Sequence, residues 1–425
     1  MTATDLARPE LWSVGLPPVV SVYQPIVDLD SGDVVAYEAL VRGAAGSALR
    51  TPGELFAWAR SQDRVTDLDW ACRLSAVTGA LGNRLPAGSG LFINVEPAVG
   101  TGPRAHLLDR LTDLAAATGA RLVVEITERR LGDDVAGLLA FADEIHARGW
   151  ALAIDDVGAE PASLALMPFL APDVIKLDLQ LIQARTTVET ARIVNAVMAQ
   201  SQTTGAMVLA EGIETHAHQE LALSMGAQLG QGWLYGRPEP LPSAHVASPI
   251  ALREWVARPR PPLSPWELVR SAPTLRRARR PLLDAMSLHL ERQVFAGDDA
   301  TVLLGAFQQA AYFNARTARR YQRLAASAFR VAVLAADVDV APAVGVLGRA
   351  LGPGDPLLQE WTVVVVSPHF AGALIAHDVG DRGIESERRF DYVVTFDRGT
   401  VLEAAASMLR RVQPWEDGGG LSHLR

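Results

Sequence analysis

The sequence contains a single cysteine, Cys72, among its 425 residues. A disulfide within the chain is therefore impossible, a cysteine-rich zinc site is excluded, and a reducing compartment such as the cytoplasm is expected. The N-terminus lacks a basic segment followed by an apolar run, so no secretory signal is expected. No stretch reaches the ~18 uninterrupted apolar residues that a membrane helix needs, so no membrane span is predicted.

Excess positive charge is also missing. The formal net charge is -9, which argues against a protein that coats DNA or RNA and predicts no DNA partner. A small anionic nucleotide can still bind through a few local cations. Hydrophobic residues make up 49 % of the chain, which is enough for sizeable cores, and the length predicts two or three domains.

Short apolar runs alternate with helical stretches from about Val19 to Leu234. The first two runs, Val19–Val27 and Val34–Val41, flank a tight-turn composition and predict a β-hairpin. Later predicted strands are Leu91–Val95, Leu122–Ile126, Ala151–Ile154, Val174–Leu177 and Met207–Ala210. Alternation of strands and helices over this length predicts an α/β barrel or a doubly wound sheet.

The C-terminal part predicts a second, smaller α/β domain. Its predicted buried strands are Val331–Leu334, Trp361–Val366 and Tyr392–Phe396. Before them, apolar side chains recur at helical spacing and predict one helical face. These side chains are Leu304, Phe307, Ala311, Ala315 and Ala318.

A basic run precedes that domain core, at Arg276, Arg277, Arg279 and Arg280. A solvated helix face is favoured for it over an anion site. Composition then divides the chain into five parts. These are an N-terminal extension (1–15), the first α/β domain (16–242), a proline-rich linker (243–263), the second domain (264–412) and a flexible tail (413–425).

Each predicted strand of the first domain runs into a polar or charged side chain. The set comprises Glu38, Asn94, Glu125, Asp155, Asp156, Lys176 and Glu211. In an α/β barrel the C-terminal ends of the strands converge on one face, so these residues would meet in space. A helix N-cap is the alternative for any single carboxylate. Lys176 cannot be such a cap, because an ammonium group accepts no hydrogen bond.

Five carboxylates in one mouth would repel one another and raise one another's pKa values unless cations neutralise them. Ligands that are all oxygen favour Mg²⁺ or Mn²⁺ over zinc or copper. The adjacent pair Asp155-Asp156 suits two metals, because one carboxylate can bridge them, and two-metal sites are typical of phosphodiester hydrolysis. The sequence therefore predicts a cofactor of two divalent metal ions.

The same residues lie in an ordered set of short motifs. The motifs are Tyr23-Gln24-Pro25-Ile26-Val27, Glu38-Ala39-Leu40-Val41-Arg42, Phe92-Ile93-Asn94-Val95, Glu125-Ile126-Thr127-Glu128, Asp155-Asp156, Lys176-Leu177-Asp178, Ala210-Glu211-Gly212-Ile213-Glu214 and Gln231-Gly232-Trp233. From about Leu16 to Pro240, the chain resembles the EAL-domain family of cyclic-di-GMP phosphodiesterases. The ordered set is far more specific than the triplet Glu38–Leu40 alone.

The resemblance implies a (βα)8 TIM-like barrel with an antiparallel first strand, and hydrolysis of cyclic-di-GMP to linear pGpG. It implies that one metal is held by Glu38, Asn94, Glu125 and Asp155, and the other by Asp155, Asp156 and Glu211. Lys176 would hold the attacking water as a catalytic residue together with Glu211 and Glu38, and Arg42 would contact a substrate phosphate. The substrate site would also include Gln24, Asp178, Glu214 and Gln231. Glu128 would steady the loop after the paired aspartates.

That loop departs from the family pattern, because Glu160-Pro161 replaces a Gly-Tyr pair. Proline stiffens the loop and removes an amide donor, and Glu160 adds a negative charge near the predicted metals. Trp233 replaces the usual tyrosine. The resemblance predicts an active hydrolase, with a catalytically silent cyclic-di-GMP receptor or a signalling scaffold as alternatives, and it allows a homodimer.

Four stretches of the second domain resemble the DICT domain, a sensory module found beside cyclic-di-GMP enzymes. They are Ser264-Pro265-Trp266-Glu267-Leu268, Leu283-Asp284-Ala285-Met286-Ser287, Glu360-Trp361-Thr362-Val363-Val364-Val365 and Arg389-Phe390-Asp391-Tyr392-Val393-Val394-Thr395. The resemblance covers about Ser264 to Arg411. It predicts that this domain regulates the first one in response to a signal that the sequence does not identify.

Overall fold

The computed structural model describes residues 14–82, 85–95, 106–127, 134–159, 161–241, 264–296, 299–381 and 384–412. The predicted linker (243–263) and tail (413–425) lie outside the described residues. The chain divides into two compact units, which we describe separately. No helix among the described residues is both long enough and apolar enough to cross a bilayer.

Eight strands of the first unit close into a barrel in chain order. They are β1 (Val19–Asp28), β2 (Val34–Gly43), β3 (Gly90–Val95), β4 (Arg121–Thr127), β5 (Ala151–Val157), β6 (Val174–Leu177), β7 (Met207–Ala210) and β8 (Leu229–Gln231). Strand β1 is antiparallel to both β2 and β8, and the other neighbouring pairs are parallel. The predicted hairpin and the barrel with an antiparallel first strand are therefore confirmed.

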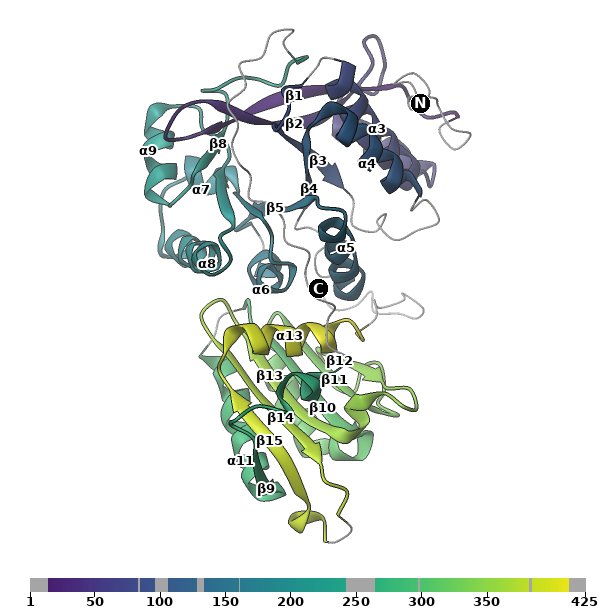
Figure 1. Ribbon diagram of the computed structural model, residues 1–425, viewed down its shortest axis with the longest axis vertical. Helices are drawn as coiled ribbons and strands as arrows, with labels where there is room; N and C mark the ends of the chain where they lie inside the picture. Colours follow the sequence, from purple (N-terminus) through teal and green to yellow (C-terminus); the bar gives the residue numbers. More distant parts are fainter. Residues whose placement is uncertain are drawn as a thin grey trace. The chain divides into compact units, whose positions relative to one another are not determined.

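Helices connect these strands and lie outside the ring (Figure 1). They are α2 (Pro52–Ser61), α3 (Val65–Gly82), α4 (His106–Thr118), α5 (Val135–Ala147), α6 (Pro161–Leu170), α7 (Leu179–Gln183), α8 (Val188–Thr204) and α9 (His216–Ser224). Local sequence fixes several of their starts. Thr51 and Thr187, for example, each accept a hydrogen bond from the backbone N–H three residues later in a capping box.

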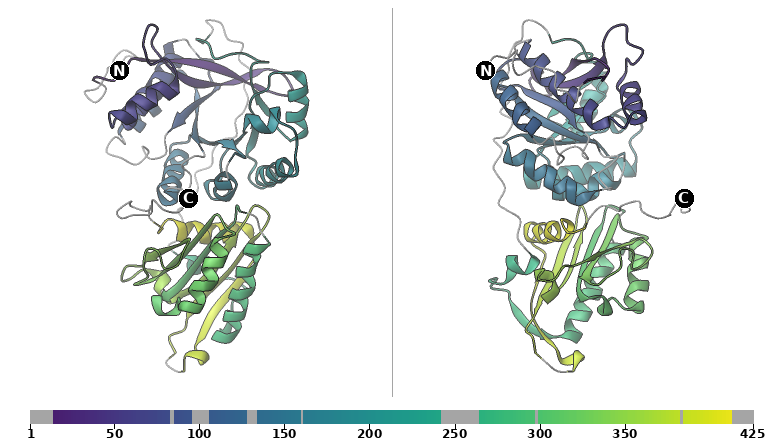
Figure 2. Two further views of the ribbon diagram at one scale, coloured as in Figure 1. Left: turned by 180° about the vertical axis from the view of Figure 1, so that it is seen from behind. Right: turned by 90° about the vertical axis from the view of Figure 1, so that its right-hand side faces the viewer.

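Seven strands of the second unit form one sheet in the order β12-β11-β10-β13-β14-β15-β9. They are β9 (Arg276–Arg279), β10 (Val302–Gln309), β11 (Arg330–Ala336), β12 (Val346–Ala350), β13 (Glu360–Val366), β14 (Ala371–Asp378) and β15 (Arg389–Thr395). Helices α11 (Arg280–Glu291) and α12 (Ala315–Ala325) cover one face, and α13 (Arg398–Leu409) covers the other (Figure 2). The remaining helix is α10 (Pro265–Val269), and single 3-10 turns are η4 (Arg292–Phe295), η5 (Ala310–Tyr312), η6 (Pro356–Gln359) and η7 (Glu385–Glu387).

Two predictions for this unit are wrong. The segment from Leu304 to Ala318 is not one helix, because its first part is β10 and α12 begins only at Ala315. Strand β10 lies between two other strands and is buried on both faces, so its continuous apolar run imitates helical spacing by chance.

The basic run is not a helix face either. Residues Arg276–Arg279 form β9, an edge strand paired with β15, and only Arg280 begins a helix. The guanidinium of Arg277 binds the carboxylate of Asp391 on the neighbouring strand, with donor–acceptor distances of 2.6 and 2.8 Å. Charged side chains of this kind also protect an exposed sheet edge from pairing with other chains.

Candidate active site

Seven strands place one polar residue each at the mouth of the barrel. Inside the barrel, an apolar layer consists largely of Ala36, Phe92, Val123, Ala153, Val174, Leu209 and Leu229. Exactly two residues further along each strand come Glu38, Asn94, Glu125, Asp155, Lys176, Glu211 and Gln231. Because side chains alternate between the two faces of a strand, each polar residue projects to the inside above its apolar predecessor. The predicted convergence of these residues is thus built into the strand period.

Lys176 lies at the centre of this polar layer. Its ammonium nitrogen is 2.7 Å from Glu125 Oε1, 2.8 Å from Asp155 Oδ1 and 2.7 Å from Glu211 Oε1, and Glu38 Oε2 is 3.8 Å away. The Lys176 side chain is 1 % exposed and that of Glu125 is fully buried. One buried cation therefore faces four carboxylates, of which Glu125 is fully buried and Glu211 is 18 % exposed.

Burial and mutual repulsion shift the pKa values of this cluster. Burial raises the pKa of Glu125 well above its usual value, and Glu38 adds to that rise. The pKa of Glu211 rises as well, again chiefly through burial. Burial alone would lower the pKa of Lys176, but the surrounding carboxylates outweigh it and raise that pKa well above its ordinary value. The carboxylates around Lys176 therefore favour its charged form in the metal-free site.

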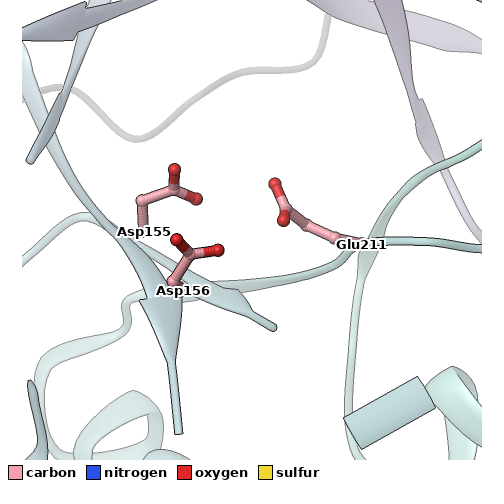
Figure 3. A group of neighbouring side chains, drawn as sticks. All are labelled: Asp155, Asp156 and Glu211. Atoms are coloured by element: carbon pink, nitrogen blue, oxygen red, sulfur yellow. The ribbon is translucent and has the colours of Figure 1, made fainter. Parts of the chain in front are cut away.

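Adjacent residues of a regular strand point to opposite faces, yet Asp155 and Asp156 both face the site. The β5–β6 register shifts between Ile154 and Val157, and Asp156 has a φ of 55°, in the left-handed region. Such a bulge adds one residue to a strand and re-aims its side chain. As a result, Asp155, Asp156 and Glu211 each offer a carboxylate oxygen within 4.8 Å of the others (Figure 3).

Glu38 is fixed by neutral donors as well as by Lys176. Its Oε1 accepts a hydrogen bond from the Asn94 amide at 3.0 Å, and its Oε2 accepts one from the Gln231 amide at 2.6 Å. The same Gln231 nitrogen lies 3.3 Å from Gln24 Oε1, and the Gln24 amide donates to the Gly236 carbonyl at 3.1 Å. These contacts tie the first strands to the last one across the barrel closure.

Three further predicted residues form no hydrogen bond or ion pair with the carboxylate cluster in the described structure. The Arg42 guanidinium donates to the carbonyl of Val41 at 2.8 Å. Asp178 caps α7 by accepting a hydrogen bond from the Gln180 N–H at 2.7 Å, so the capping alternative applies to it. Glu214 is exposed just before α9. Glu128 lies outside the described residues.

A cavity of about 370 Å³ adjoins this cluster, and sequence reasoning missed part of its wall. Glu38, Asn94 and Asp155 line it, together with Asp69 and Arg73 from α3. These two α3 side chains form an ion pair and are only 3 % and 1 % exposed. Opposite charges four residues apart ordinarily indicate a solvated helix face. The sequence signal for the burial of this pair is that apolar residues flank it along the helix, Leu68 before Asp69 and Val77 after Arg73. Both flanking residues are buried in the structure.

The family profile described as the EAL domain matches residues 18–238, and that of the DICT domain, "Sensory domain in DIguanylate Cyclases and Two-component system", matches residues 267–379. An uncharacterised protein of Mycobacterium tuberculosis is 28 % identical over 225 residues, which cover 52 % of this chain and 36 % of that protein. The bifunctional diguanylate cyclase/cyclic di-GMP phosphodiesterase MucR of Pseudomonas aeruginosa is 28 % identical over 228 residues, covering 51 % of this chain and 33 % of MucR.

The chain thus spans about a third of the length of these curated relatives. Among solved structures, the PaMucR phosphodiesterase in complex with c-di-GMP is 27 % identical, with a TM-score of 0.45 over 52 % of this chain and 92 % of that chain. A Klebsiella pneumoniae BlrP1 manganese/cy-diGMP complex is 28 % identical, with a TM-score of 0.47 over 55 % of this chain and 58 % of that chain. Because the EAL profile covers more than half of the 425 residues, the chain belongs to the EAL domain family.

Proposed function

We propose that residues 16–242 hydrolyse cyclic-di-GMP to linear pGpG in the cytoplasm, with two divalent ions, Mg²⁺ or Mn²⁺, as cofactor. Support comes from membership of the EAL domain family and from relatives named cyclic di-GMP phosphodiesterases, such as NbdA of Pseudomonas aeruginosa at 29 % identity. The observation that carries the proposal is the convergence of Asp155, Asp156 and Glu211 beside Lys176.

The side chains of the site fit a divalent cation. Three carboxylates come within ligand distance of one another, and all the donors are oxygen atoms, which suits Mg²⁺ and Mn²⁺. Oε2 of Glu125 is buried and has no hydrogen-bond partner among the described residues, whereas Oε1 of Glu125 and Oδ1 of Asp155 are paired with Lys176. Buried acceptors in this state are stabilised by an added cation.

In the proposed assignment, Asp155, Asp156 and Glu211 would hold one ion, and Glu38, Asn94, Glu125 and Asp155 would hold the other. When bound, the ions supply positive charge that activates a water molecule and stabilises charge developing on the phosphate.

Lys176, whose charged form the carboxylates favour, donates hydrogen bonds to the attacking water and orients it. Glu211 and Glu38 position Lys176 through their ion pairs with it. Arg42 is the proposed partner of a substrate phosphate, because a guanidinium pairs with two phosphate oxygens at once. Gln24, Asp178, Glu214 and Gln231 would complete the substrate site.

The test is incubation of the full chain with cyclic-di-GMP and Mn²⁺, followed by chromatographic separation of the products. We expect pGpG to accumulate, EDTA to stop the reaction, and Glu211→Gln to abolish it. Glu189→Gln, which changes an exposed carboxylate on α8, is the matched control and should keep full activity. Saturable nucleotide binding without any product would instead establish the receptor alternative.

We further propose that residues 264–412 regulate the barrel and add no group to its active site. All the proposed catalytic and metal-binding residues precede Pro240, and the second unit has its own sheet and its own core. A chain ended after Ser248 should bind metal and hydrolyse cyclic-di-GMP at an altered rate. A typical coupling between sites would change that rate roughly 5–150-fold. A folded, metal-loaded but inactive fragment would contradict a purely regulatory role.

A further inference from the structure

The second unit encloses a cavity of about 360 Å³ between α11, α12 and one face of its sheet. From α11, the residues at 280, 284, 287, 288 and 291 line it, which is the spacing of a single helical face. From α12, residues 316, 317 and 320 line it in the same way. Cavities of roughly 300–1,000 Å³ with a few convergent polar groups are typical of small-molecule sites.

A bulge in β10 shapes the floor of this cavity. Phe307 and Gln308 are neighbours in the chain, yet both line it. The β10–β11 register shifts between Ala306 and Gln309, and Gln308 has a φ of 57°. A left-handed conformation is unusual for a residue that is not glycine, and it is retained where the surrounding structure imposes it. Here it presents an amide and an aromatic ring to the same space.

Guanidinium groups and aromatic rings dominate the wall. Arg388 donates hydrogen bonds to the Tyr312 hydroxyl at 2.6 Å and to Gln308 Oε1 at 3.2 Å, and the guanidinium carbon lies 5.5 Å from the Tyr312 ring centre. Arg280 lies 5.2 Å from the same ring centre and 5.7 Å from that of Trp361. The cavity thus offers flat cationic and aromatic surfaces side by side.

Positive charge exceeds negative charge in the lining. It contains four arginines and two carboxylates, those of Asp284 and Glu291. The Glu291 side chain is 3 % exposed and is already neutralised by Arg320, whose Nε lies 2.6 Å from its Oε2. Arg316 is exposed at the rim and forms no ion pair within the described part of the chain. Arg280 and Arg388 are paired with Glu385 and Asp378, which lie outside the lining, so the guanidinium left for a ligand is that of Arg316.

Ser287 gives independent evidence for a missing partner. The residue is only 4 % exposed, it lines the cavity, and its hydroxyl has no hydrogen-bond partner in the described structure. A buried hydroxyl without a partner costs about 1–3 kcal/mol, and such groups ordinarily bind a protein atom, a water molecule or a ligand.

We propose that this cavity binds a small planar aromatic anion. The anionic group pairs with the guanidinium of Arg316 at the rim, the ring packs against Tyr312 and Trp361, and the hydroxyl of Ser287 binds a polar atom of the ligand. An organic cation is disfavoured because the guanidinium of Arg316 is the lining charge that no carboxylate of the described structure neutralises, and a nonplanar anion would leave the aromatic wall uncovered. This site lies in a different unit from the barrel and does not depend on the function proposed above.

The probe is salicylate, titrated against the full chain in EDTA by ligand-observed NMR and calorimetry. We expect saturable binding of salicylate, weaker binding of cyclohexanecarboxylate, and none of benzylamine. Arg316→Ala should weaken salicylate binding about ten-fold, as expected for loss of one charge-assisted contact. Arg319→Ala is the matched control, because it removes an exposed arginine of the same helix outside the cavity.

Ser287→Ala separates binding from folding. It removes a buried, unpartnered polar atom, so the melting temperature of the ligand-free chain should rise while the shift caused by salicylate should shrink. A structural role for the hydroxyl would move both in the same direction. Absence of saturable salicylate binding, equal binding of benzylamine, or equal affinities of the Arg316 and Arg319 variants would each overturn the proposal.

Discussion

Replacing Lys176 by methionine removes the cation at the centre of the carboxylate cluster while keeping a long side chain in its place. Glu125, Asp155 and Glu211 then lose a charged partner at 2.7–2.8 Å that is itself almost fully buried. The three carboxylates and Glu38 are left with only their mutual repulsion and their remaining hydrogen bonds. In the absence of metal, the barrel should therefore lose stability.

The size of the loss follows from the burial of the pair. Removing one partner of a buried ion pair lowers the free energy of unfolding by about 3–5 kcal/mol. For a unit of this length, each kcal/mol corresponds to about 2–4 °C in melting temperature, so the expected decrease is about 6–20 °C. The raised pKa values of Glu125 and Glu211 allow partial protonation near neutral pH, which reduces the loss. The effect should therefore increase as pH rises and these two carboxylates ionise.

Divalent metal should reverse much of this loss. A cation that binds only the folded state stabilises it, and the variant site carries one more negative charge than the wild-type site. Calorimetric scans in EDTA and in Mn²⁺ should show a larger Mn²⁺-induced rise in melting temperature for Lys176→Met than for wild type. Turnover should fall about 100-fold or more, as it does when a preorganised donor is removed from other active sites.

Arg192→Met is the control for this experiment. Arg192 pairs with Glu189 on the surface of α8, where an ion pair contributes at most about 1 kcal/mol. Its melting temperature should stay close to that of wild type in both conditions. An unchanged melting temperature of Lys176→Met in EDTA, or equal losses with and without Mn²⁺, would refute the charge argument.

Three other substitutions test separate parts of the structure. Glu38→Ala should abolish turnover without lowering the melting temperature, because it relieves repulsion in the metal-free cluster, and an active variant would exclude Glu38 from the site. Burial raises the pKa of Glu360 from 4.5 to about 7, so the folded second unit holds a proton that the unfolded chain releases. The free energy of unfolding of the second unit should therefore fall by about 3 kcal/mol as pH rises from 4.5 to 7, and then level off. Urea unfolding at several pH values measures this, and Glu360→Gln should flatten the dependence. A Cβ at Gly232 would lie 2.0 Å from the Ile213 carbonyl oxygen, so Gly232→Ala should lower both melting temperature and activity, whereas Gly53→Ala, at an open position, should change neither by much.

The barrel could be predicted because most of its strands carry a strong local signal. Seven of the eight strands begin or end close to the apolar runs in the sequence, and the hairpin turn fixes the direction of β1. Strand β8 was missed as an element because it has only three residues, Leu229–Gln231. Its Gln231 was found only through the family motif. The residue numbers at which the five predicted parts of the chain begin and end stay a prediction.

The second unit was predicted less well because its strands lack alternation. Strand β10 is buried on both faces, so no polar residue interrupts its apolar run. Strand β9 was missed for the opposite reason. An exposed edge strand can be almost wholly polar, so its arginines gave no apolar run that would indicate a strand. In both cases the decisive information is the position of the strand in the sheet, which depends on residues far away in the chain.

The two cavities share a feature that local sequence rules do not contain. At each one a strand bulges, and a residue other than glycine takes a left-handed conformation, Asp156 in the barrel and Gln308 in the second unit. The bulge lets two neighbouring side chains face the same space, which is the carboxylate cluster in the barrel and the cavity in the second unit. In a regular strand, alternation would place them on opposite faces. Such a conformation costs about 1–3 kcal/mol, so it persists only where the rest of the fold imposes it. In the barrel, the result is that Asp155 and Asp156 both lie within 4.8 Å of Glu211. By the same physical reasoning, the pairing of Phe307 with Gln308 marks the cavity of the second unit as a built site rather than a packing defect.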